Sequence, residues 1–430
     1  RPSATGGGRM AKERVIVGVD VGTTKICALI GEVDQDNRLN IVGVGVSQSQ
    51  GLRKGMVVNI DEAAAAIREA LDKTERISGY KIGTALVGIA GSHITSQNSR
   101  GIVAVSPNMH EIGQQDIDRA IEAARAQPLP PNREILHVIP REYVVDGENG
   151  IHDPLGMSGN RLEVETHIVS GAVSSIHNLI KCVEKTGIEI DDIVLEPLAS
   201  SEAVLTSAER DLGVAMIDIG GGTTDLAIFI NGSIWHTAVI GVGGNHLTND
   251  IAVGLRTPFE VAEEMKRKYG TALADRIDVN EMIKIATFDN AGGEPVSRRF
   301  LCEIIEARVR EMFVLVQEEI RSAGYQGVLP AGIVLTGGSS QLTDLCDLAR
   351  DVLQMPARVG GPAHLTGLVD SINSPAFATS VGLLSWGLRN GDHNNGGRGA
   401  APPSGGPDGP SWRDVFSRFS GWLKHFWASA

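Results

Sequence analysis

The stretch Met216-Ile-Asp-Ile-Gly-Gly-Gly-Thr-Thr-Asp-Leu-Ala-Ile-Phe229 decides the fold of this 430-residue chain. Two apolar runs flank three glycines, with one carboxylate before the glycines and one after them. Apolar runs of this length around a glycine cluster predict a β-hairpin with a tight turn. Backbone N–H groups at Gly220, Gly221 and Gly222 can approach an anion closely because glycine has no Cβ. The hairpin is therefore a candidate phosphate site, although a plain glycine-rich turn has the same pattern.

Hydroxyl and carboxylate side chains extend this candidate phosphate site. Thr223 and Thr224 follow the glycines directly and add hydrogen-bond donors. Asp218 precedes the glycines, where its carboxylate would hold a water molecule of Mg²⁺, a cation that prefers oxygen ligands. The hairpin therefore predicts a phosphate group together with Mg²⁺.

A similar hairpin is expected near the start of the chain, in Val15-Ile-Val-Gly-Val-Asp-Val-Gly-Thr-Thr-Lys-Ile-Cys-Ala-Leu-Ile30. An apolar run again ends in Asp-x-Gly, and Thr-Thr and a second apolar run follow. The residues that mirror the first motif, with the lysine after them, are Asp20, Gly22, Thr23, Thr24 and Lys25. The repetition strengthens the phosphate interpretation.

A third glycine turn, Thr336-Gly-Gly-Ser-Ser340, follows another apolar run late in the chain. Together the three motifs resemble the ATPase fold shared by actin, sugar kinases and DnaK-type chaperones. The resemblance implies an α/β architecture of two ribonuclease-H-like lobes that close on ATP and Mg²⁺, with Asp20 and Asp218 directed at the metal. It also implies that the residues packed beside the adenosine are Gly337, Gly338 and Ser339.

Composition narrows the class of protein. The chain is 42% hydrophobic and 21% charged, as is typical of soluble globular proteins, and its length suits at least two lobes. A net charge of −13 argues against wholesale nucleic-acid binding. The four cysteines lack Cys-x-x-Cys spacing, which argues against a zinc site or a disulfide framework. We expect no transmembrane helix and no signal peptide, because no sufficiently long apolar run occurs.

Helix and strand patterns divide the chain into expected parts. The first lobe is expected at residues 12–88, 166–210 and 359–390, and the second at 211–245 and 305–358. The remaining parts are a disordered extension at 1–11, an inserted α+β subdomain at 89–165, a second inserted subdomain at 246–304, a flexible linker at 391–410 and an amphipathic helix at 411–428. Within these parts, Asp61 is expected to cap a helix, and Pro140 to separate two strands.

The ATPase resemblance assigns roles to residues between and after the hairpins. Glu196 matches an acidic residue that helps to place the attacking water in DnaK-type relatives, although a carboxylate favoured by a helix dipole explains it equally well. Gly243, Gly244 and Asn245 open a helix, which is a ready anion site that touches the terminal phosphate in relatives.

Glu263 and Lys266 match a Glu-x-x-Lys pair that contacts the ribose and adenine in relatives. The i, i+3 spacing places both side chains on one face of a helix. A solvated, salt-bridged helix face is the alternative interpretation of the same pattern.

The end of the chain combines a flexible segment with an amphipathic one. Residues 391–410 are rich in Gly, Pro, Ser and Asn, which is typical of a linker. Beyond them, large apolar residues recur with helical spacing among basic residues. This pattern favours a helix at a membrane interface with anionic lipid over a core or partner-binding helix. The residues expected to enter the membrane are Trp412, Val415, Phe416, Phe419, Trp422, Leu423, Phe426 and Trp427.

The whole pattern resembles the FtsA family of bacterial cell-division proteins over about residues 12–428. Gly88-Ile-Ala-Gly-Ser-His-Ile94 and Ala262-Glu-Glu-Met-Lys-Arg-Lys-Tyr-Gly270 carry the resemblance beside the three glycine motifs. It implies an ATP-binding, filament-forming protein that holds the tubulin-like FtsZ at the cytoplasmic face of the membrane and contacts other division proteins. It also places the FtsZ site in the second inserted subdomain, where Arg298 and Arg299 would meet the acidic FtsZ tail.

Other members of the ATPase superfamily are the alternatives. A PilM-like pilus assembly scaffold shares the fold, but an amphipathic anchor is not expected at its end. A sugar kinase needs a base at the γ-phosphate, and Glu196 is the one candidate, so we expect ATP binding with at most slow hydrolysis. A DnaK-type chaperone would need a β-rich peptide-binding domain after the ATPase.

Overall fold

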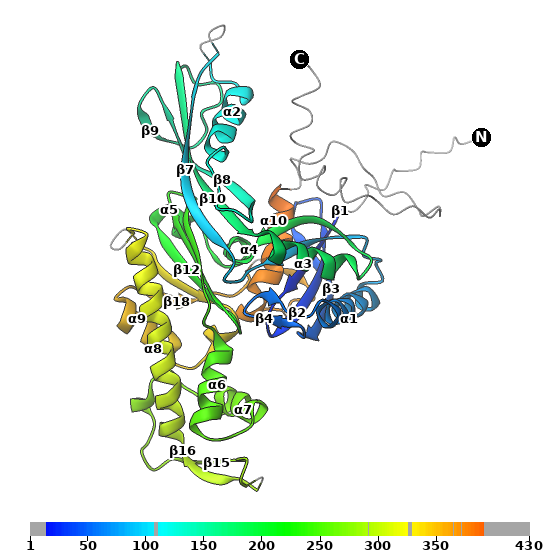
Figure 1. Cartoon of the computed structure of the whole chain (residues 1–430), viewed down its shortest axis with the longest axis vertical. Helices are drawn as coiled ribbons and strands as arrows, with labels where there is room; N and C mark the ends of the chain where they lie inside the picture. The colour runs from blue at the N-terminus through cyan, green and yellow to red at the C-terminus, as the bar shows by residue number, and fades with distance from the viewer. Residues whose placement is uncertain are drawn as a thin grey trace, which may run out of the picture. The chain divides into compact units, whose positions relative to one another are not determined.

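The computed structural model describes residues 14–106, 111–290, 292–325, 329–363, 365–370 and 372–390 (Figure 1). The expected extension at residues 1–11 lies outside the described residues, and so do the linker at 391–410 and the amphipathic helix at 411–428. Within the described ranges, every helix is too short or too polar to cross a lipid bilayer.

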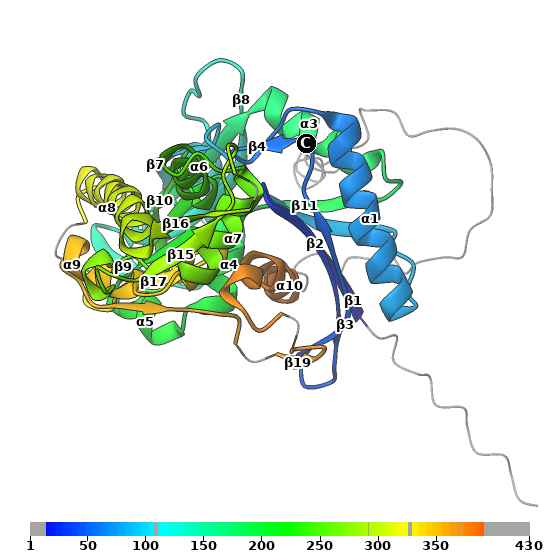
Figure 2. The same cartoon turned by 90° about the horizontal axis from the view of Figure 1, so that it is seen from below.

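The first large sheet has the strand order β11-β6-β1-β2-β3-β19. Its strands are β1 (Arg14–Val21), β2 (Lys25–Val33), β3 (Leu39–Gln48), β6 (Thr84–Ile89), β11 (Glu189–Leu195) and β19 (Thr366–Gly367). Helices α1 (Ile60–Ser78) and α3 (Val173–Glu184) pack on one face, and α10 (Ala378–Asn390) packs on the other (Figure 2). The sheet is therefore covered by helices on both faces.

The second large sheet has the order β14-β13-β12-β17-β18 and repeats the plan of the first. Its strands are β12 (Val214–Ile219), β13 (Thr224–Ile230), β14 (Ser233–Ile240), β17 (Gly332–Thr336) and β18 (Ala357–Val359). In both sheets three consecutive strands form an antiparallel meander. The first strand of each meander pairs in parallel with a fourth strand, which pairs in parallel with a fifth. This repetition confirms the prediction of two similar α/β lobes, each with one glycine hairpin.

The uninterrupted apolar run of β12 follows from burial on both of its faces. Ala215 and Ile217 join the core formed with α8 (Arg298–Ser322) and α9 (Leu345–Leu353). Val214 and Met216 join the other core, to which α4 (Glu196–Val204) and α10 contribute. A strand buried on both faces loses the alternation of polar and apolar residues, so its run looks continuous.

A third sheet, with the order β7-β10-β8-β9, is inserted between β6 and α3. It consists of β7 (Thr95–Ala104), β8 (Arg133–Val145), β9 (Glu148–Ile151) and β10 (Arg161–Ala172), with α2 (Gln114–Arg125) packed on it. β10 pairs with β7 and β8 along most of its length, so this sheet continues beyond residue 165.

Two local predictions about these elements are wrong. Pro140 does not separate two strands, because β8 continues through it. Proline lacks a backbone N–H, and it fits here because the register of the strand pair shifts beside its partner Thr166. Asn59, not Asp61, caps α1: its side chain accepts the N–H groups of Asp61 (3.1 Å) and Glu62 (3.3 Å). Asp61 instead lies in the first turn, where the helix dipole favours a carboxylate.

The remaining elements connect the sheets and build the second inserted part. They are β4 (Leu52–Arg53), β5 (Met56–Val57), α4 (Glu196–Val204), α5 (Ser207–Leu212), α6 (Gly244–Gly254), α7 (Phe259–Tyr269), η1 (Ala274–Arg276), β15 (Met282–Ile285), β16 (Glu294–Ser297), η2 (Gly338–Gln341) and η3 (Pro375–Phe377). Helices α6 and α7 pack against α8, which leads back to the second lobe. Of these elements, α4, α6, α7, η2 and η3 contribute residues to the cavity described next.

Candidate functional site

A cavity of about 550 Å³ lies where the two glycine hairpins meet. The predicted residues that line it are Asp20, Gly22, Thr23, Thr24, Lys25, Glu196, Asp218, Gly220, Gly221, Gly222, Thr223, Gly244, Asn245, Glu263, Lys266, Gly337, Gly338 and Ser339. Thr224 and Gly243 are not among the lining residues. Thr224 instead donates its hydroxyl to the carbonyl of Val242 at 2.8 Å. The cavity thus gathers residues from motifs more than 300 positions apart in the chain.

The hairpins touch each other directly, and glycine makes this possible. A Cβ on Gly221 would overlap the hydroxyl of Thr24, and one on Gly222 would lie 2.7 Å from the hydroxyl of Thr23. A Cβ on Gly220 would meet only ordinary contacts. Gly221 and Gly222 are therefore needed for close approach between the lobes, whereas Gly220 is not.

The start of α6 braces the second hairpin. The N–H groups of Gly244 and Asn245 donate to the carbonyls of Gly220 and Gly221 at 2.9 and 2.8 Å. Ser339 adds a bond from its hydroxyl to the Gly220 carbonyl at 3.1 Å. These two N–H groups, which the sequence predicted as an anion site, are thus already used within the protein. They hold the glycine turn in shape instead.

Four carboxylates crowd the closed end of the cavity. Asp20, Asp218 and Asp225 are buried, and Glu196 starts α4 beside them. Burial raises the pKa of Asp218 to about 6, and it raises the pKa of Asp20 as well. Burial and the neighbouring carboxylates raise the pKa values of Glu196 and Asp225 well above their usual range. A cation in this cavity would relieve the repulsion.

Asp225 has one carboxylate oxygen that is buried without a hydrogen bond in the described part of the chain. Its Oδ2 accepts the Thr223 hydroxyl at 3.1 Å, but its buried Oδ1 has no hydrogen-bond partner among the described residues. Across the described ranges no three His, Cys, Asp or Glu side chains form a ready metal cage. Mg²⁺ commonly keeps several waters and uses one or two carboxylates with substrate phosphates, so this acidic end fits such an ion.

Lys25 supplies the positive charge of the first hairpin. Its ammonium donates to the Ala376 carbonyl at 2.5 Å and lies 3.3 Å from the centre of the Phe377 ring. The same ammonium favours ionisation of Asp20. Lys25 therefore links the first hairpin to the turn that precedes α10.

The open end of the cavity is lined by α7 and by the loop after β17. Lys266 lies 2.6 Å from Glu263 and donates to the Thr248 hydroxyl (2.8 Å) and to the Gly244 carbonyl (3.1 Å). Burial lowers the pKa of Lys266. Because these bonds point inward, this pair does not behave as a solvated, salt-bridged helix face. It connects the cavity wall to the brace of the second hairpin.

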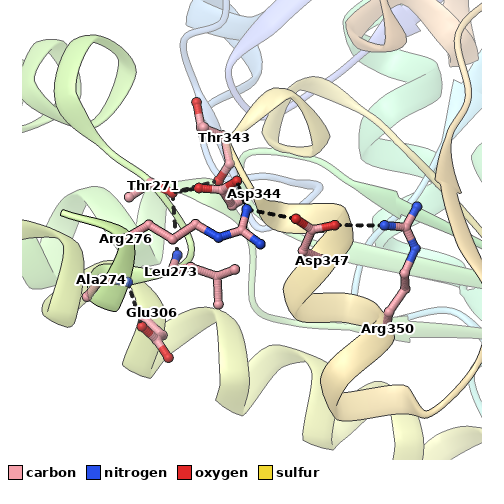
Figure 3. A network of polar contacts seen from close by, with 9 residues as sticks. All are labelled: Thr271, Leu273, Ala274, Arg276, Glu306, Thr343, Asp344, Asp347 and Arg350. Atoms are coloured by element: carbon pink, nitrogen blue, oxygen red, sulfur yellow. Dashed lines mark hydrogen bonds and ion pairs between the residues drawn. The ribbon is translucent and has the colours of Figure 1, made fainter.

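Polar contacts behind this end hold the loop that carries Thr343 (Figure 3). The Ala272 N–H and the Thr271 hydroxyl donate to the Thr343 carbonyl at 2.9 and 3.2 Å. Thr271 also donates to Asp344 at 2.6 Å, and Asp344 has a left-handed backbone with φ of 61°. Arg276 pairs with the same aspartate and, at 2.8 Å, with Asp347. The network stabilises a strained turn at the cavity rim.

Several lining residues were not predicted from sequence. They are Val21, Gly55, Ala90, Asp225, Leu247, Arg267, Gly270, Gln341, Leu342, Thr343, Pro375, Ala376 and Thr379. The second carboxylate of the Asp218 hairpin was visible in the motif, and Gln341 to Thr343 directly follow the third glycine turn. Pro375, Ala376 and Thr379 carried no such signal, since they lie in an unremarkable helix start.

The two arginines predicted to bind a partner occupy different surroundings at the start of α8. Arg298 donates to the Tyr269 carbonyl at 2.9 Å and to Glu281 at 2.8 Å. Arg299 is 3.5 Å from Glu303 one turn along the helix. Arg298 thus bonds to residues outside its helix, while Arg299, whose side chain is 35% exposed against 25% for Arg298, pairs along the helix itself. The predicted membrane residues between Trp412 and Trp427 lie outside the described residues.

Comparison with known proteins agrees with this geometry. The family model described as "Cell division protein FtsA" matches residues 215–382, and "SHS2 domain inserted in FTSA" matches residues 91–170. The cell division protein FtsA of Pseudomonas aeruginosa is 47% identical, over 87% of this chain and 90% of its own length. The FtsA protein of Bacillus subtilis is 42% identical, over 89% of this chain and 85% of its own length. The FtsA protein of Escherichia coli is 37% identical, over 89% of this chain and 92% of its own length.

Solved structures with the same fold have little sequence in common with this chain. The "PilM-PilN type IV pilus biogenesis complex" has a TM-score of 0.63 at 17% identity, covering 87% of this chain and 98% of the other. MreB5 of Spiroplasma citri bound to ADP has a TM-score of 0.54 at 15% identity, covering 89% and 99%. These similarities support an actin-like ATPase fold, and the chain belongs to the FtsA family of cell division proteins.

Proposed function

We propose that this protein binds ATP with Mg²⁺ between its lobes, assembles into actin-like filaments and tethers the FtsZ ring to the membrane during bacterial cell division. The observation that carries the proposal is the cavity between two glycine hairpins, each with a buried carboxylate, in a member of the FtsA family. The MreB5 neighbour was solved with ADP, which supports a nucleotide in this fold.

The hairpins would hold the phosphates, and Asp20 and Asp218 would hold the waters of Mg²⁺. Bound Mg²⁺ would neutralise phosphate charge and offset the repulsion among the buried carboxylates. Glu196 would orient the attacking water, since it lines the cavity beside the two hairpins. With Asp20 and Asp218 assigned to the metal waters, Glu196 and Asp225 are the carboxylates left beside the phosphates among the described lining residues, and we expect at most slow hydrolysis.

The nucleoside would lie at the open end of the cavity. Glu263 and Lys266 on α7 would face the ribose and base, and Gly337, Gly338 and Ser339 would pack on the other side. Lys266 also contacts Gly244, so a bound nucleoside would be linked to the brace of the second hairpin.

The membrane and FtsZ would be held by different parts of the chain. The apolar residues from Trp412 to Trp427 would insert at the cytoplasmic face of the membrane at the division site, as a peripheral anchor for anionic lipid. Arg299 is better placed than Arg298 to meet the acidic FtsZ tail, because Arg298 is occupied by Tyr269 and Glu281. Filament contacts and other division proteins would use further surfaces.

A PilM-like pilus scaffold is less well supported. The PilM-PilN structure shares the fold at 17% identity, whereas the FtsA relatives share 37% to 47% over most of the chain. Fold similarity at that level does not carry a function.

Co-pelleting with FtsZ and anionic liposomes, with and without ATP and Mg²⁺, tests the proposal. We expect the full chain to bring FtsZ into the liposome pellet, and a variant that ends at residue 390 to leave it in solution. The Arg299→Glu variant should pellet with liposomes but carry less FtsZ, while Arg321→Glu, at the far end of the same helix, serves as the charge control. Equal pelleting by the shortened variant would exclude the anchor.

A further inference from the structure

Three hydroxyl groups form hydrogen bonds to Asp218 and Asp20, two of the four carboxylates at the cavity. We propose that Ser200, Thr379 and Ser380 are positioning residues, which orient Asp218 and Asp20 to receive the water shell of a nucleotide-bound Mg²⁺. The inference rests on the proposed nucleotide function and names the side chains that prepare the site for the metal.

The hydrogen bonds fall on one oxygen of each carboxylate, and the two that the serines donate are short. Ser200 donates to Oδ2 of Asp218 at 2.6 Å, and Thr379 reaches the same oxygen at 3.3 Å. Ser200 and Thr379 are themselves 2.9 Å apart, so they form a linked pair. Ser380 donates to Oδ2 of Asp20 at 2.7 Å. In both lobes a hydroxyl therefore supports the Oδ2 atom.

The other oxygen of each carboxylate points toward a glycine turn that lines the cavity. Oδ1 of Asp218 lies against the backbone of Gly337, where any Cβ would overlap it. Oδ1 of Asp20 is 3.7 Å from the position that a Cβ of Gly22 would occupy. With Oδ2 engaged by hydroxyl groups, Oδ1 is the atom that each carboxylate can offer to the water shell of a cation.

Two helices fix the hydroxyls in place. Ser200 lies on α4, and Thr379 and Ser380 lie at the start of α10. The helices pack so closely that a Cβ on Gly382 would overlap the carbonyl of Ala199. Such a rigid crossing leaves the hydroxyls little freedom to move, which is what a positioning residue requires.

A purely structural role would give these hydroxyls local partners, as a neighbour illustrates. Ser201 is as buried as Ser200, but its hydroxyl donates back to the Leu198 carbonyl at 2.7 Å within the same helix. Ser200 and Ser380, both with 0% exposure, instead direct their hydroxyls at carboxylates from strands. Burying a hydroxyl in an apolar crossing is costly without such a partner. Ser201 is thus a matched control.

The same start of α10 reaches both lobes. Thr379 bonds to the carboxylate of the second lobe, and Ser380 bonds to that of the first. Lys25 adds a bond from the first hairpin to Ala376, three residues earlier. One helix start is therefore in contact with both halves of the phosphate site.

The test measures the affinity of the full-length protein for ATP, with Mg²⁺ and with EDTA. We expect S200A, T379V and S380A to weaken Mg²⁺–ATP binding about 10-fold, since partners behind metal-directed groups have effects of this size. Binding in EDTA should change less than about 2-fold, because the hydroxyls act through carboxylates that face the metal. S201A and T379S should bind like the wild type in both conditions.

The possible outcomes separate the two ideas. Variants that behave like S201A, or that weaken binding equally with and without Mg²⁺, would overturn the positioning role while leaving the proposed function intact. Wild-type protein that binds no Mg²⁺–ATP would overturn the proposed function itself. If an alanine variant fails to fold, comparing the Mg²⁺–ATP affinities of T379V and T379S tests the positioning role, since these variants differ mainly in the hydroxyl.

Discussion

Asp20-Val-Gly-Thr-Thr-Lys25 in the first lobe and Asp218-Ile-Gly-Gly-Gly-Thr-Thr-Asp225 in the second both connect an antiparallel strand pair. The second turn has two more glycines, and the residue after the threonines is acidic where the first hairpin has a lysine. In the second lobe Asp218 faces Asp225 directly across the strand pair, whereas Asp20 faces Cys27 in the first. Like charges directly opposite each other are destabilising.

This difference means that the hairpins are not electrostatically equivalent. The first contains its own cation, because Lys25 favours the ionised form of Asp20. The second places two buried carboxylates together, and one oxygen of Asp225 has no partner among the described residues. The second lobe therefore depends more on a cation supplied from outside, which a Mg²⁺–nucleotide complex would bring.

The largest expected effect separates the two lobes by truncating their carboxylates. We predict that Asp218→Ala lowers the affinity for Mg²⁺–ATP at least about 100-fold, because it removes the group that would hold the metal's water shell. Asp20→Ala should have a smaller effect, since Lys25 persists beside the phosphates. Isothermal titration calorimetry of both variants measures this order. Equal losses would remove the asymmetry, and unchanged affinity in both would contradict the site.

The next effect concerns stability in the absence of nucleotide. The pKa of Asp218 is raised from 3.8 to about 6, so the folded state holds this proton more tightly than the unfolded state. This contribution to stability is fully present below pH 4 and is lost as the pH rises through about 6. We predict that Asp218→Asn, which cannot ionise, gains about 3 kcal/mol of unfolding free energy relative to wild type between pH 4 and pH 7.

Urea denaturation across that pH range, in EDTA, measures the gain. Asp225→Asn should also stabilise the protein at pH 7, because burial and Asp218 raise the pKa of Asp225 well above its usual range. With Mg²⁺ and ATP added, the wild type should instead have a higher free energy of unfolding than either variant. A difference that does not depend on pH would show that the carboxylates are compensated in some other way.

A smaller effect tests the contact between the hairpins. Gly221→Ala should weaken nucleotide binding about 10-fold, because its Cβ would overlap the Thr24 hydroxyl and force the lobes apart, at a cost of about 1–3 kcal/mol. Gly241→Ala is the control, since Gly241 is not among the residues that line the cavity and its Cβ would meet nothing within 4 Å. If both variants bind alike, close approach of the turns is not required for binding.

The sequence predicted the site residues that are adjacent in the chain, and it missed those that folding brings together from distant positions. Each hairpin could be recognised because its carboxylate, glycines and threonines are adjacent in the chain. The hydroxyl that supports Asp20 belongs to Ser380, 360 residues away, and no pattern in its own helix sets it apart. Asp225 was visible in the motif, but its position opposite Asp218 depends on strand register. Pro140 was predicted wrongly for the same reason, since the register shift beside it, where Arg141 of its own strand has no register partner in β10, appears only when the two strands pair.

The smallest predicted effect compares the threonines of the two turns. Thr224 is buried and bonds to the Val242 carbonyl at 2.8 Å, whereas Thr24 is exposed at the cavity. Thr224→Val should lower the free energy of unfolding by about 1 kcal/mol, since it removes one buried neutral hydrogen bond. Thr24→Val should leave stability nearly unchanged and weaken nucleotide binding instead. If Thr224 supports the fold while Thr24 faces the ligand, Thr224→Val should lose more stability in denaturation, and Thr24→Val should lose more affinity in ATP titration.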